Sequence, residues 1–281
     1  MILFSVIIPF YSSQPDLLIK AVKSALNQTV SNLEVIVIDD GSPLSAKDEL
    51  SSINDNRVRV IRHHENSNGG VARNTGIDIA RGEYIAFLDY DDIWYENKLE
   101  RQFELFHVNN KIVDNVVIYS KCKIIDGNRV LIRPLRCIKQ DESVGEYLFC
   151  AKQIIQTSGI FLKTELAKKV KFDDLKRHQD YQFCLSLESV GAKFFMLDSP
   201  SYEFIQIPKL NDYNFSRAWL CSYSKNLNVS AIKGFKKLVI LRSMVSHHLY
   251  MESFTYSIKN NILISFLDVV LRKIIKKCIF K

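Results

Sequence analysis

The chain has 281 residues, of which 47% are hydrophobic and 25% charged, values that fit one large globular domain or one domain with an appended piece. It has no run of about 18 apolar residues without charge, so no membrane-spanning helix is expected. Residues 1–11 lack the basic start and the cleavage site of a signal peptide. The six cysteines form no C-x-x-C pair, which argues against a zinc or redox motif and favours a reducing compartment. Apolar or mixed surroundings predict burial of Cys122, Cys150, Cys184 and Cys221.

The positive charge of the chain is concentrated at its C-terminal end. The whole sequence has a formal net charge of +7, but residues 225–281 hold eleven Lys and Arg against two acidic residues, a net charge of +9. Residues 1–224 therefore carry −2. A basic tail is typical of a segment that meets anionic lipid, nucleic acid or an acidic partner, and also of a solvated helix face.

The first 110 residues alternate between strand and helix patterns with short connections. The predicted strands cover residues 4–9, 33–38, 58–62 and 84–88, and the predicted helices cover residues 16–28, 70–80 and 97–108. Ser42 or Ser45 is expected to cap another helix after the second strand. This alternation predicts an α/β fold, with a mostly parallel central sheet flanked by helices.

Polar residues follow three of these strands where each strand ends. Tyr11 follows the first strand, Asp39 and Asp40 follow the second, and residues 89–92 follow the fourth. Ligands of open α/β sheets bind beyond the carboxyl ends of the strands. The sequence therefore predicts one ligand site formed by these turns.

The second half of the chain is less regular. Asp126-Gly127 between two apolar runs predicts a hairpin. Further strands are expected at residues 154–162 and 193–197, and helices at residues 166–170 and 179–190. From about residue 216 the pattern is helical and basic, which places a soft boundary near residue 210.

Asp89-Tyr90-Asp91-Asp92 is the first candidate for chemistry, because it places three carboxylates at the end of a buried strand. Carboxylates this close repel one another unless a cation is present. Mg²⁺ and Mn²⁺ take oxygen ligands, commonly one or two carboxylates together with phosphate oxygens. D-x-D also occurs in acidic turns and helix caps, so its position after a strand is what favours a metal site.

Five motifs occur along the chain in a characteristic order. They are SVIIPFY from residue 5, VIVIDDGS from residue 35, N-x-N-G-G-V-A-R-N-x-G from residue 66, YIAFLDYDD from residue 84 and R-H-Q-D-Y from residue 177. With this order and spacing, residues 3–205 resemble glycosyltransferase family 2. The resemblance implies a GT-A fold over residues 1–210, with a nucleotide-binding half (1–110), an acceptor-side half (111–210) and a helical extension (211–281). It also implies a nucleotide-diphosphate sugar donor and inversion of the anomeric centre.

The resemblance assigns the nucleobase and the ribose to the first two strand ends. Pro9 and Tyr11 would line the nucleobase pocket, and Asp40 together with Asp39 would contact the uracil or the ribose. Carboxylates suit this role because they accept hydrogen bonds from ribose hydroxyls and from a base N–H. The alternative for both acids is to cap the helix after Gly41.

The diphosphate end of the donor would lie against the next two motifs. Asn68 and Arg73 would close the nucleotide site, and Arg73 supplies a cationic fork suited to phosphate, with a surface salt bridge as its alternative. Asp89 would face the ribose or the metal, and Asp91 would bind Mn²⁺ or Mg²⁺ bridging the diphosphate. Tyr90 stands where the family usually has a small residue, which bears on donor choice. Asp92 receives no role.

Asp180 is the expected catalytic base. In an inverting transfer the acceptor hydroxyl loses a proton as it attacks, and one carboxylate can accept that proton. The leaving diphosphate needs charge stabilisation, which a metal can supply. Asp180 also lies where a helix is predicted to begin, so a first-turn acid is the alternative role. His178 is expected to be a neighbour that shapes the site.

Residues 258–281 combine apolar positions with lysines that gather toward the end. One interpretation is an interfacial helix lying on an anionic membrane, which would suit a lipid-linked acceptor. The other is a helix that covers the core and has a basic end.

Other classes of protein are disfavoured by what the motifs lack. A sugar-nucleotide pyrophosphorylase or an NAD enzyme would need a glycine-rich loop directly after the first strand, where residues 9–12 have no glycine. No nucleic-acid-binding module is recognised. A non-catalytic nucleotide- or glycan-binding module stays open, and it would tolerate loss of Asp180. The favoured function is transfer of a sugar, most commonly from UDP, to a saccharide or lipid-linked acceptor in polysaccharide, O-antigen or capsule biosynthesis, in the cytoplasm and peripherally at the inner face of the membrane.

Overall fold

The computed structural model describes residues 2–206 and 212–279, and it divides the chain into two compact units. Unit 1 comprises Met1–Gln140 and Ile154–Gln206, and unit 2 comprises Asp141–Gln153 and Ile207–Lys281. The boundary expected near residue 210 lies outside the described residues. The assignment of separate roles to residues 1–210 and 211–281 therefore stays a prediction.

The N-terminal half of unit 1 is a parallel sheet with the strand order β3-β2-β1-β4. Its strands agree closely with the predicted ones: β1 (Phe4–Phe10), β2 (Leu33–Asp39), β3 (Val58–Arg62) and β4 (Tyr84–Phe87). All three pairings between these strands are parallel. Because every residue of β1 and β2 is buried, these two strands form the centre of the core.

The second half of unit 1 makes the sheet mixed. The antiparallel strand β8 (Phe161–Lys163) joins β4 to β6 (Val116–Asp126), which then runs parallel to β9 (Lys193–Ile205). The predicted hairpin is present, with β7 (Arg129–Arg133) antiparallel to β6. The two-residue strand β5 (Ile93–Trp94) pairs with β9 and was not predicted.

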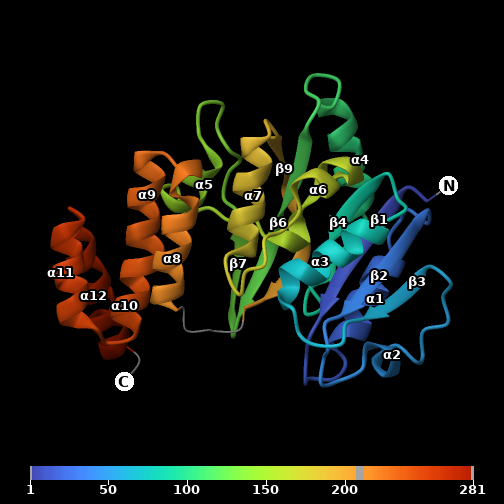
Figure 1. Cartoon of the computed structure of the whole chain (residues 1–281), viewed down its shortest axis with the longest axis horizontal. Coiled ribbons are helices and arrows are strands. Elements are labelled where there is room, and N and C mark those ends of the chain that lie inside the picture. Colours follow the sequence, from blue (N-terminus) through green and yellow to red (C-terminus); the bar gives the residue numbers. More distant parts are fainter. Residues whose placement is uncertain (1, 207–211, 280–281) are drawn as a thin grey trace. The chain divides into compact units, whose positions relative to one another are not determined.

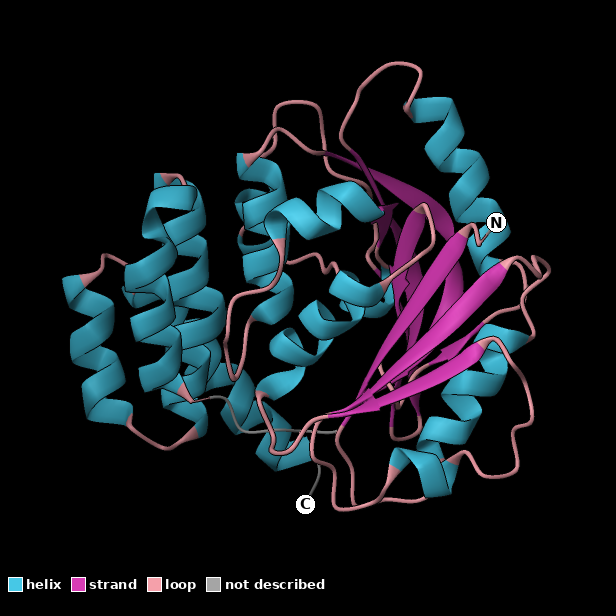
Figure 2. Cartoon of the chain, turned by 45° about the vertical axis from the view of Figure 1, so that its right-hand side comes forward, coloured by secondary structure: helices cyan, strands magenta, loops and turns pink. Residues whose placement is uncertain are grey.

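Helices cover both faces of this sheet (Figure 2). One core cluster joins Val6 and Ile8 of β1 to α1 (Leu17–Leu26) and α4 (Lys98–Asn109). The opposite face carries α3 (Asn68–Ile79), α6 (Thr164–Val170) and α7 (Gln179–Ser189). A Cβ atom at Gly76 of α3 would come within 2.5 Å of Ile7, so glycine allows this helix to pack close to β1. The short helix α2 (Ala46–Glu49) is capped by Ser45, one of the two predicted caps.

Two expectations about local structure were wrong, and one helix was not predicted. Residues 154–162 do not form one strand, because the 3₁₀ turn η1 (Thr157–Gly159) interrupts them and binds polar groups of neighbouring elements before β8 begins. The helix α5 (Val144–Phe149) was missed, although its capping box of Ser143 and Glu146 is a sequence signal. Cys150 and Cys221 are exposed rather than buried, because they lie at the end of α5 and on the open face of α8.

Unit 2 is helical, as expected for the C-terminal extension (Figure 1). Beside α5 it contains α8 (Tyr213–Tyr223), η2 (Ser224–Asn226), α9 (Val229–Phe235), the π-helical segment η3 (Lys236–Leu241), α10 (Arg242–Ser246), α11 (Tyr250–Lys259) and α12 (Leu263–Ile279). Its aromatic centre is Phe235, whose ring lies 4.9 Å from the rings of Phe149 and Trp219. Among the described helices, none is long and apolar enough to cross a membrane.

Candidate active site

A cleft of about 230 Å³ in unit 1 lies at the carboxyl end of β4. Arg73 reaches it from α3, Asp89 from the turn after β4, and Asp180 from the first turn of α7. Its other lining residues are Gln156, Thr157, Lys176, Arg177, His178 and Gln179. Residues more than 100 positions apart in the sequence thus share one cleft.

Arg73 connects the three elements that form this cleft. Its guanidinium forms an ion pair with Asp89 and donates a hydrogen bond from Nη1 to Gln179 Oε1 at 2.8 Å. Thr157 Oγ1 donates to Asp89 Oδ2 at 3.1 Å. Because Arg73 is only 6% exposed, its planar fork is held in one orientation by α7 and the β4 turn.

Asp92 is the buried member of the acidic cluster. Ser158 Oγ donates to Asp92 Oδ2 at 2.5 Å and accepts a hydrogen bond from the backbone N–H of Asp89 at 3.0 Å. Burial, followed by the negative charges of Asp89 and Asp91, raises the pKa of Asp92 well above its ordinary value. Asp92 therefore anchors the η1 turn against the end of β4.

Asp180 is half-buried in the first turn of α7. Burial raises the pKa of Asp180 to about 6, while the backbone N–H of Tyr181 and the charge of Arg73 oppose that rise. His178 precedes the helix with a left-handed φ of 61°, and its ring stacks on Tyr181 at 5.2 Å. Burial and the charge of Arg177 lower the pKa of His178 to about 4, so this imidazole is neutral at pH 7.

Both acids after β2 have partners within the protein. Asp39 accepts hydrogen bonds from the backbone N–H groups of Ser42 and Ala46 and pairs with Arg62, so its two oxygens perform the capping role left open by the sequence. Asp40 bonds to His63 at 2.8 Å and accepts from the backbone N–H of Ser67 at 3.0 Å. Asp40 therefore sets the position of the loop that leads into α3.

The remaining predicted nucleotide residues do not line the cleft around Asp180. Pro9 is buried within β1, whereas Tyr11 just beyond it is 48% exposed. Asn68 has a left-handed φ of 72°, and its side chain donates to Asp174 at 3.0 Å. Tyr90 packs edge-on against Phe10 at 5.4 Å and belongs to the rim of the hydrophobic core.

Asp89 and Asp91 suit a divalent cation only when a bound phosphate compound supplies further oxygen ligands. Across residues 2–206 and 212–279, no group of three or more His, Cys, Asp or Glu side chains could hold a metal by itself. Asp89 and Asp91 are both partly exposed on the same turn. Two carboxylates completed by phosphate oxygens form a donor set that Mg²⁺ and Mn²⁺ accept, so these residues fit such a metal.

A buried network behind η1 was not predicted. Lys98 donates to Gln102 at 2.6 Å, and Gln102 donates to the carbonyl of Gly159 at 2.8 Å. Trp94 Nε1 donates to the carbonyl of Ser158 at 3.1 Å, and Lys98 Nζ lies 4.0 Å from the centre of the Trp94 ring. Among the cleft residues that were not predicted, Arg177 and Gln179 had a sequence signal, since both lie inside R-H-Q-D-Y. The partners of η1 lie in segments distant in sequence, which no local pattern reveals.

The family model described as Glycosyl transferase family 2 matches residues 5–151 of the chain. The chain belongs to glycosyltransferase family 2. Among curated relatives of this family, the amylovoran biosynthesis glycosyltransferase AmsB of Erwinia amylovora is 32% identical over 83% of this chain and 81% of its own length. The Escherichia coli protein named UDP-Glc:alpha-D-GlcNAc-diphosphoundecaprenol beta-1,3-glucosyltransferase WfgD is 33% identical over 46% of this chain and 49% of its own.

The structural similarity to solved proteins covers more of the chain than the family model does. The crystal structure of S. aureus TarS 1-349 in complex with UDP-GlcNAc has a TM-score of 0.67 at 19% identity, and the match covers 95% of this chain and 79% of that one. At this identity the likeness shows the fold, and it confirms the GT-A-like α/β architecture with C-terminal helices. The family membership and the named relatives confirm that this family 2 chain is a glycosyltransferase.

Proposed function

We propose that the chain transfers a sugar, with inversion, from a UDP-linked donor to a hydroxyl of a saccharide or lipid-linked acceptor in bacterial surface-polysaccharide biosynthesis. The observation that carries this proposal is the shared cleft of Asp180 and the Arg73–Asp89 pair. The name of WfgD, which specifies a UDP-glucose donor and a diphospholipid acceptor, and the UDP-GlcNAc complex of TarS support the choice of donor and acceptor.

Asp180 accepts the proton in this mechanism. As the acceptor oxygen bonds to the anomeric carbon, its proton passes to the Asp180 carboxylate. The bond from that carbon to the β-phosphate oxygen breaks, and its electron pair leaves with the diphosphate. The pKa of about 6 leaves Asp180 ionised at pH 7 while keeping it a stronger base than an ordinary aspartate.

The turn after β4 would receive the diphosphate. Asp89 and Asp91 would hold a Mn²⁺ or Mg²⁺ ion, which when bound supplies positive charge to the leaving group. Arg73 orients Asp89 and adds a second positive charge close to it. Pro9, Tyr11, Asp40 and Asn68 are proposed to bind the nucleoside from the adjoining strand ends.

Contact with the inner face of the membrane is the last element of the proposal. Exposed apolar residues recur along α12 at intervals of three or four residues, as on an interfacial helix: Ile264, Leu267, Leu271, Ile274 and Ile275. Ile264 is 85% exposed, and Leu267 and Leu271 are each 57% exposed. Of the segment proposed for this contact, 258–281, residues 280 and 281 lie outside the described residues.

A donor screen with Mn²⁺ and a matched pair of variants tests the transfer. Asp180→Asn keeps nearly the same shape but cannot accept the proton, so the transfer rate should fall by about 10²- to 10⁴-fold while UDP affinity is unchanged. Asp78→Asn, at a surface residue that pairs with Lys171, is the matched control and should transfer at the native rate.

Three outcomes would contradict parts of this assignment. Normal transfer by Asp180→Asn would remove Asp180 as the base. Full turnover by metal-free enzyme would remove the metal role of Asp89 and Asp91. Nucleotide binding by the native chain without transfer to any acceptor in the screen would favour the non-catalytic module.

A further inference from the structure

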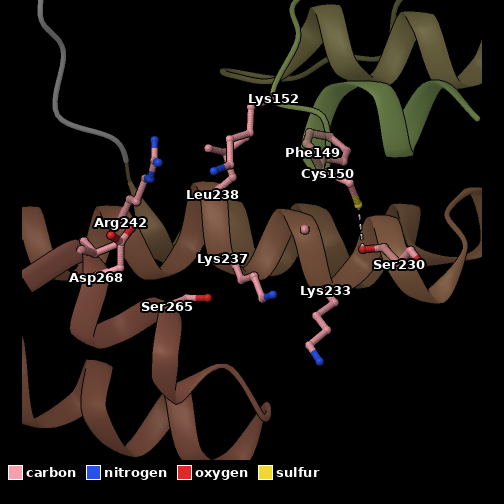
Figure 3. A pocket seen from close by; sticks show the side chains of 12 residues that line it. Phe149, Cys150, Lys152, Ser230, Lys233, Lys237, Leu238, Arg242, Ser265 and Asp268 are labelled. Atoms are coloured by element: carbon pink, nitrogen blue, oxygen red, sulfur yellow. Dashed lines mark hydrogen bonds between the residues drawn. The ribbon is translucent and has the colours of Figure 1, made fainter. Parts of the chain in front are cut away.

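A second cavity, a groove of about 450 Å³, lies within unit 2 (Figure 3). Its walls come from the end of α5, from the helix that runs through α9, η3 and α10, and from α12. None of its lining residues belongs to the cleft around Asp180. Four of its lining residues are cationic: Lys152, Lys233, Lys237 and Arg242.

The lining of this groove carries four cationic side chains and one acidic side chain. In the part of the chain that the structure describes, none of the four groove cations forms an ion pair with a carboxylate. The single acid of the lining, Asp268, is bound by Arg272 at 2.8 Å. Glu146 at the start of α5 is engaged in the capping box of that helix with Ser143. Like charges gathered in one groove stabilise a bound anion.

Two backbone features shape the groove. Gly234 lets α9 meet the end of α5, because a Cβ atom there would come within 2.8 Å of the carbonyl group of Phe149. The helix then widens into the π-helical segment η3, which contributes Lys237 and Leu238 to the lining. Such segments are rare and recur at functional sites, because they redirect side chains that a regular helix would place elsewhere.

The chemistry of the lining is amphiphilic. Phe149, Leu238 and Val269 contribute apolar surface beside the cations. On α12, Asp268 lies in the groove, while Leu267 and Leu271 of the exposed apolar stripe lie one residue before it and three residues after it. The groove and the stripe therefore occupy adjoining faces of one helix.

We propose that this groove binds the phosphate headgroup of an anionic lipid. Lys233 and Lys237 would contact the phosphate oxygens while the α12 stripe lies among the acyl chains. The inference deepens the membrane contact proposed above and rests on it, but it does not depend on sugar transfer. The groove would thus recognise one chemical group of the membrane, the lipid phosphate, in addition to the general attraction of a basic segment to an anionic surface.

Vesicle co-sedimentation with the full chain tests the proposal. The vesicles consist of phosphatidylcholine with or without phosphatidate. The groove variant carries Lys233→Ala and Lys237→Ala, and the control carries Lys225→Ala and Lys259→Ala, which removes the same charge from exposed lysines of unit 2 outside the groove. We expect the groove variant to bind phosphatidate vesicles about tenfold more weakly than the control does. The two should bind pure phosphatidylcholine equally.

Unchanged circular dichroism and UDP affinity show that the variants are folded. Equal losses in the two variants would overturn the groove, because diffuse surface charge would then explain the binding. A further outcome combines two results: inorganic pyrophosphate shifts the melting temperature of the native chain but not of the groove variant, and vesicles bind the groove variant and the control equally. In that case the groove binds a soluble phosphate compound, and the lipid assignment is wrong. If the native chain binds neither kind of vesicle, the membrane contact itself fails, and sugar transfer is unaffected by that result.

Discussion

At the scale of single residues, the site depends on how strongly each acid is held in its charged form. Asp89 is paired with Arg73, Asp92 is buried against Ser158, and Asp180 lies in a half-buried helix start. Of these acids, Asp92 and Asp180 have pKa values raised by burial. Burial therefore makes both Asp92 and Asp180 stronger bases than an ordinary aspartate.

The pH profile of transfer should report Asp180. Because the base must be ionised, kcat/KM should fall as the pH drops through about 6, the pKa of that group. The profile of Asp78→Asn should have the same midpoint. An acid limb with a midpoint near 4 would mean that a carboxylate of ordinary pKa accepts the proton instead.

Lys98 offers a residue-scale test of the buried network. Burial lowers the pKa of Lys98 well below its ordinary value. At pH values between the folded and the unfolded pKa, only the unfolded state carries the proton on this amine. The stability of the wild type therefore rises with pH in that range. Lys98→Met removes this pH dependence. At pH 7 its free energy of unfolding should equal that of the wild type or exceed it by up to about 2 kcal/mol. Urea unfolding at pH 7 and pH 9 measures this, with the exposed Lys111→Met as control. A large destabilisation at both pH values would show that the hydrogen bond to Gln102 outweighs the burial of the amine.

At the scale of elements, one buried glutamate connects the parallel strands near their amino ends, away from the cleft around Asp180. Glu34 at the start of β2 is 1% exposed. It accepts hydrogen bonds from Ser5 of β1, Arg59 of β3 and the backbone N–H of Arg81 before β4. Burial by itself would raise the pKa of Glu34, but these hydrogen bonds outweigh it and the pKa lies below its ordinary value.

Glu34→Gln should therefore destabilise the sheet by about 2 kcal/mol at pH 7, since the arginines are partly exposed and screened. A lowered folded pKa gives stability that is present above the unfolded pKa of about 4.3 and is lost as the pH falls below it. The difference in free energy of unfolding between Glu34→Gln and the wild type should become smaller at pH 3. Glu165→Gln, at an exposed position, serves as the control, and a pH-independent difference would contradict the ionic origin.

The elements also show which parts of the fold a sequence pattern can predict. The strands β1, β2 and β4 and the helix α1 were predicted because burial on both faces and helical periodicity are local signals. The η1 turn was mistaken for strand because its apolar neighbours share a strand-like pattern, while the contacts that bend it come from Asp92, Trp94 and Gln102. For the same reason Asp180 and Arg73 could be named from their motifs, but Thr157 and Ser158 could not.

At the scale of the whole molecule, the exposed apolar stripe of α12 is the feature that folding alone does not explain. Leu267→Glu combined with Leu271→Glu should leave the helical content unchanged, because both side chains are already more than half exposed. Vesicle binding should fall by about tenfold or more, since apolar contact with lipid is replaced by charge. A control with Val108→Glu and Val229→Glu, at exposed apolar positions away from the stripe, should bind as the native chain does. Equal binding by all three proteins would leave the stripe without a membrane role.

The division of unit 2 into two stretches of sequence has a consequence for synthesis on the ribosome. Residues 141–153 emerge early, but α9, against which α5 packs, follows only after β8, α7 and β9 have been made. Until then the apolar side chains of α5, including Leu148 and Phe149, lack the partners that bury them in the finished unit. A nascent chain that stops near residue 206 would hold every strand of the sheet and still expose this helix. A chain truncated at the end of the sheet is therefore expected to aggregate more readily than the full chain.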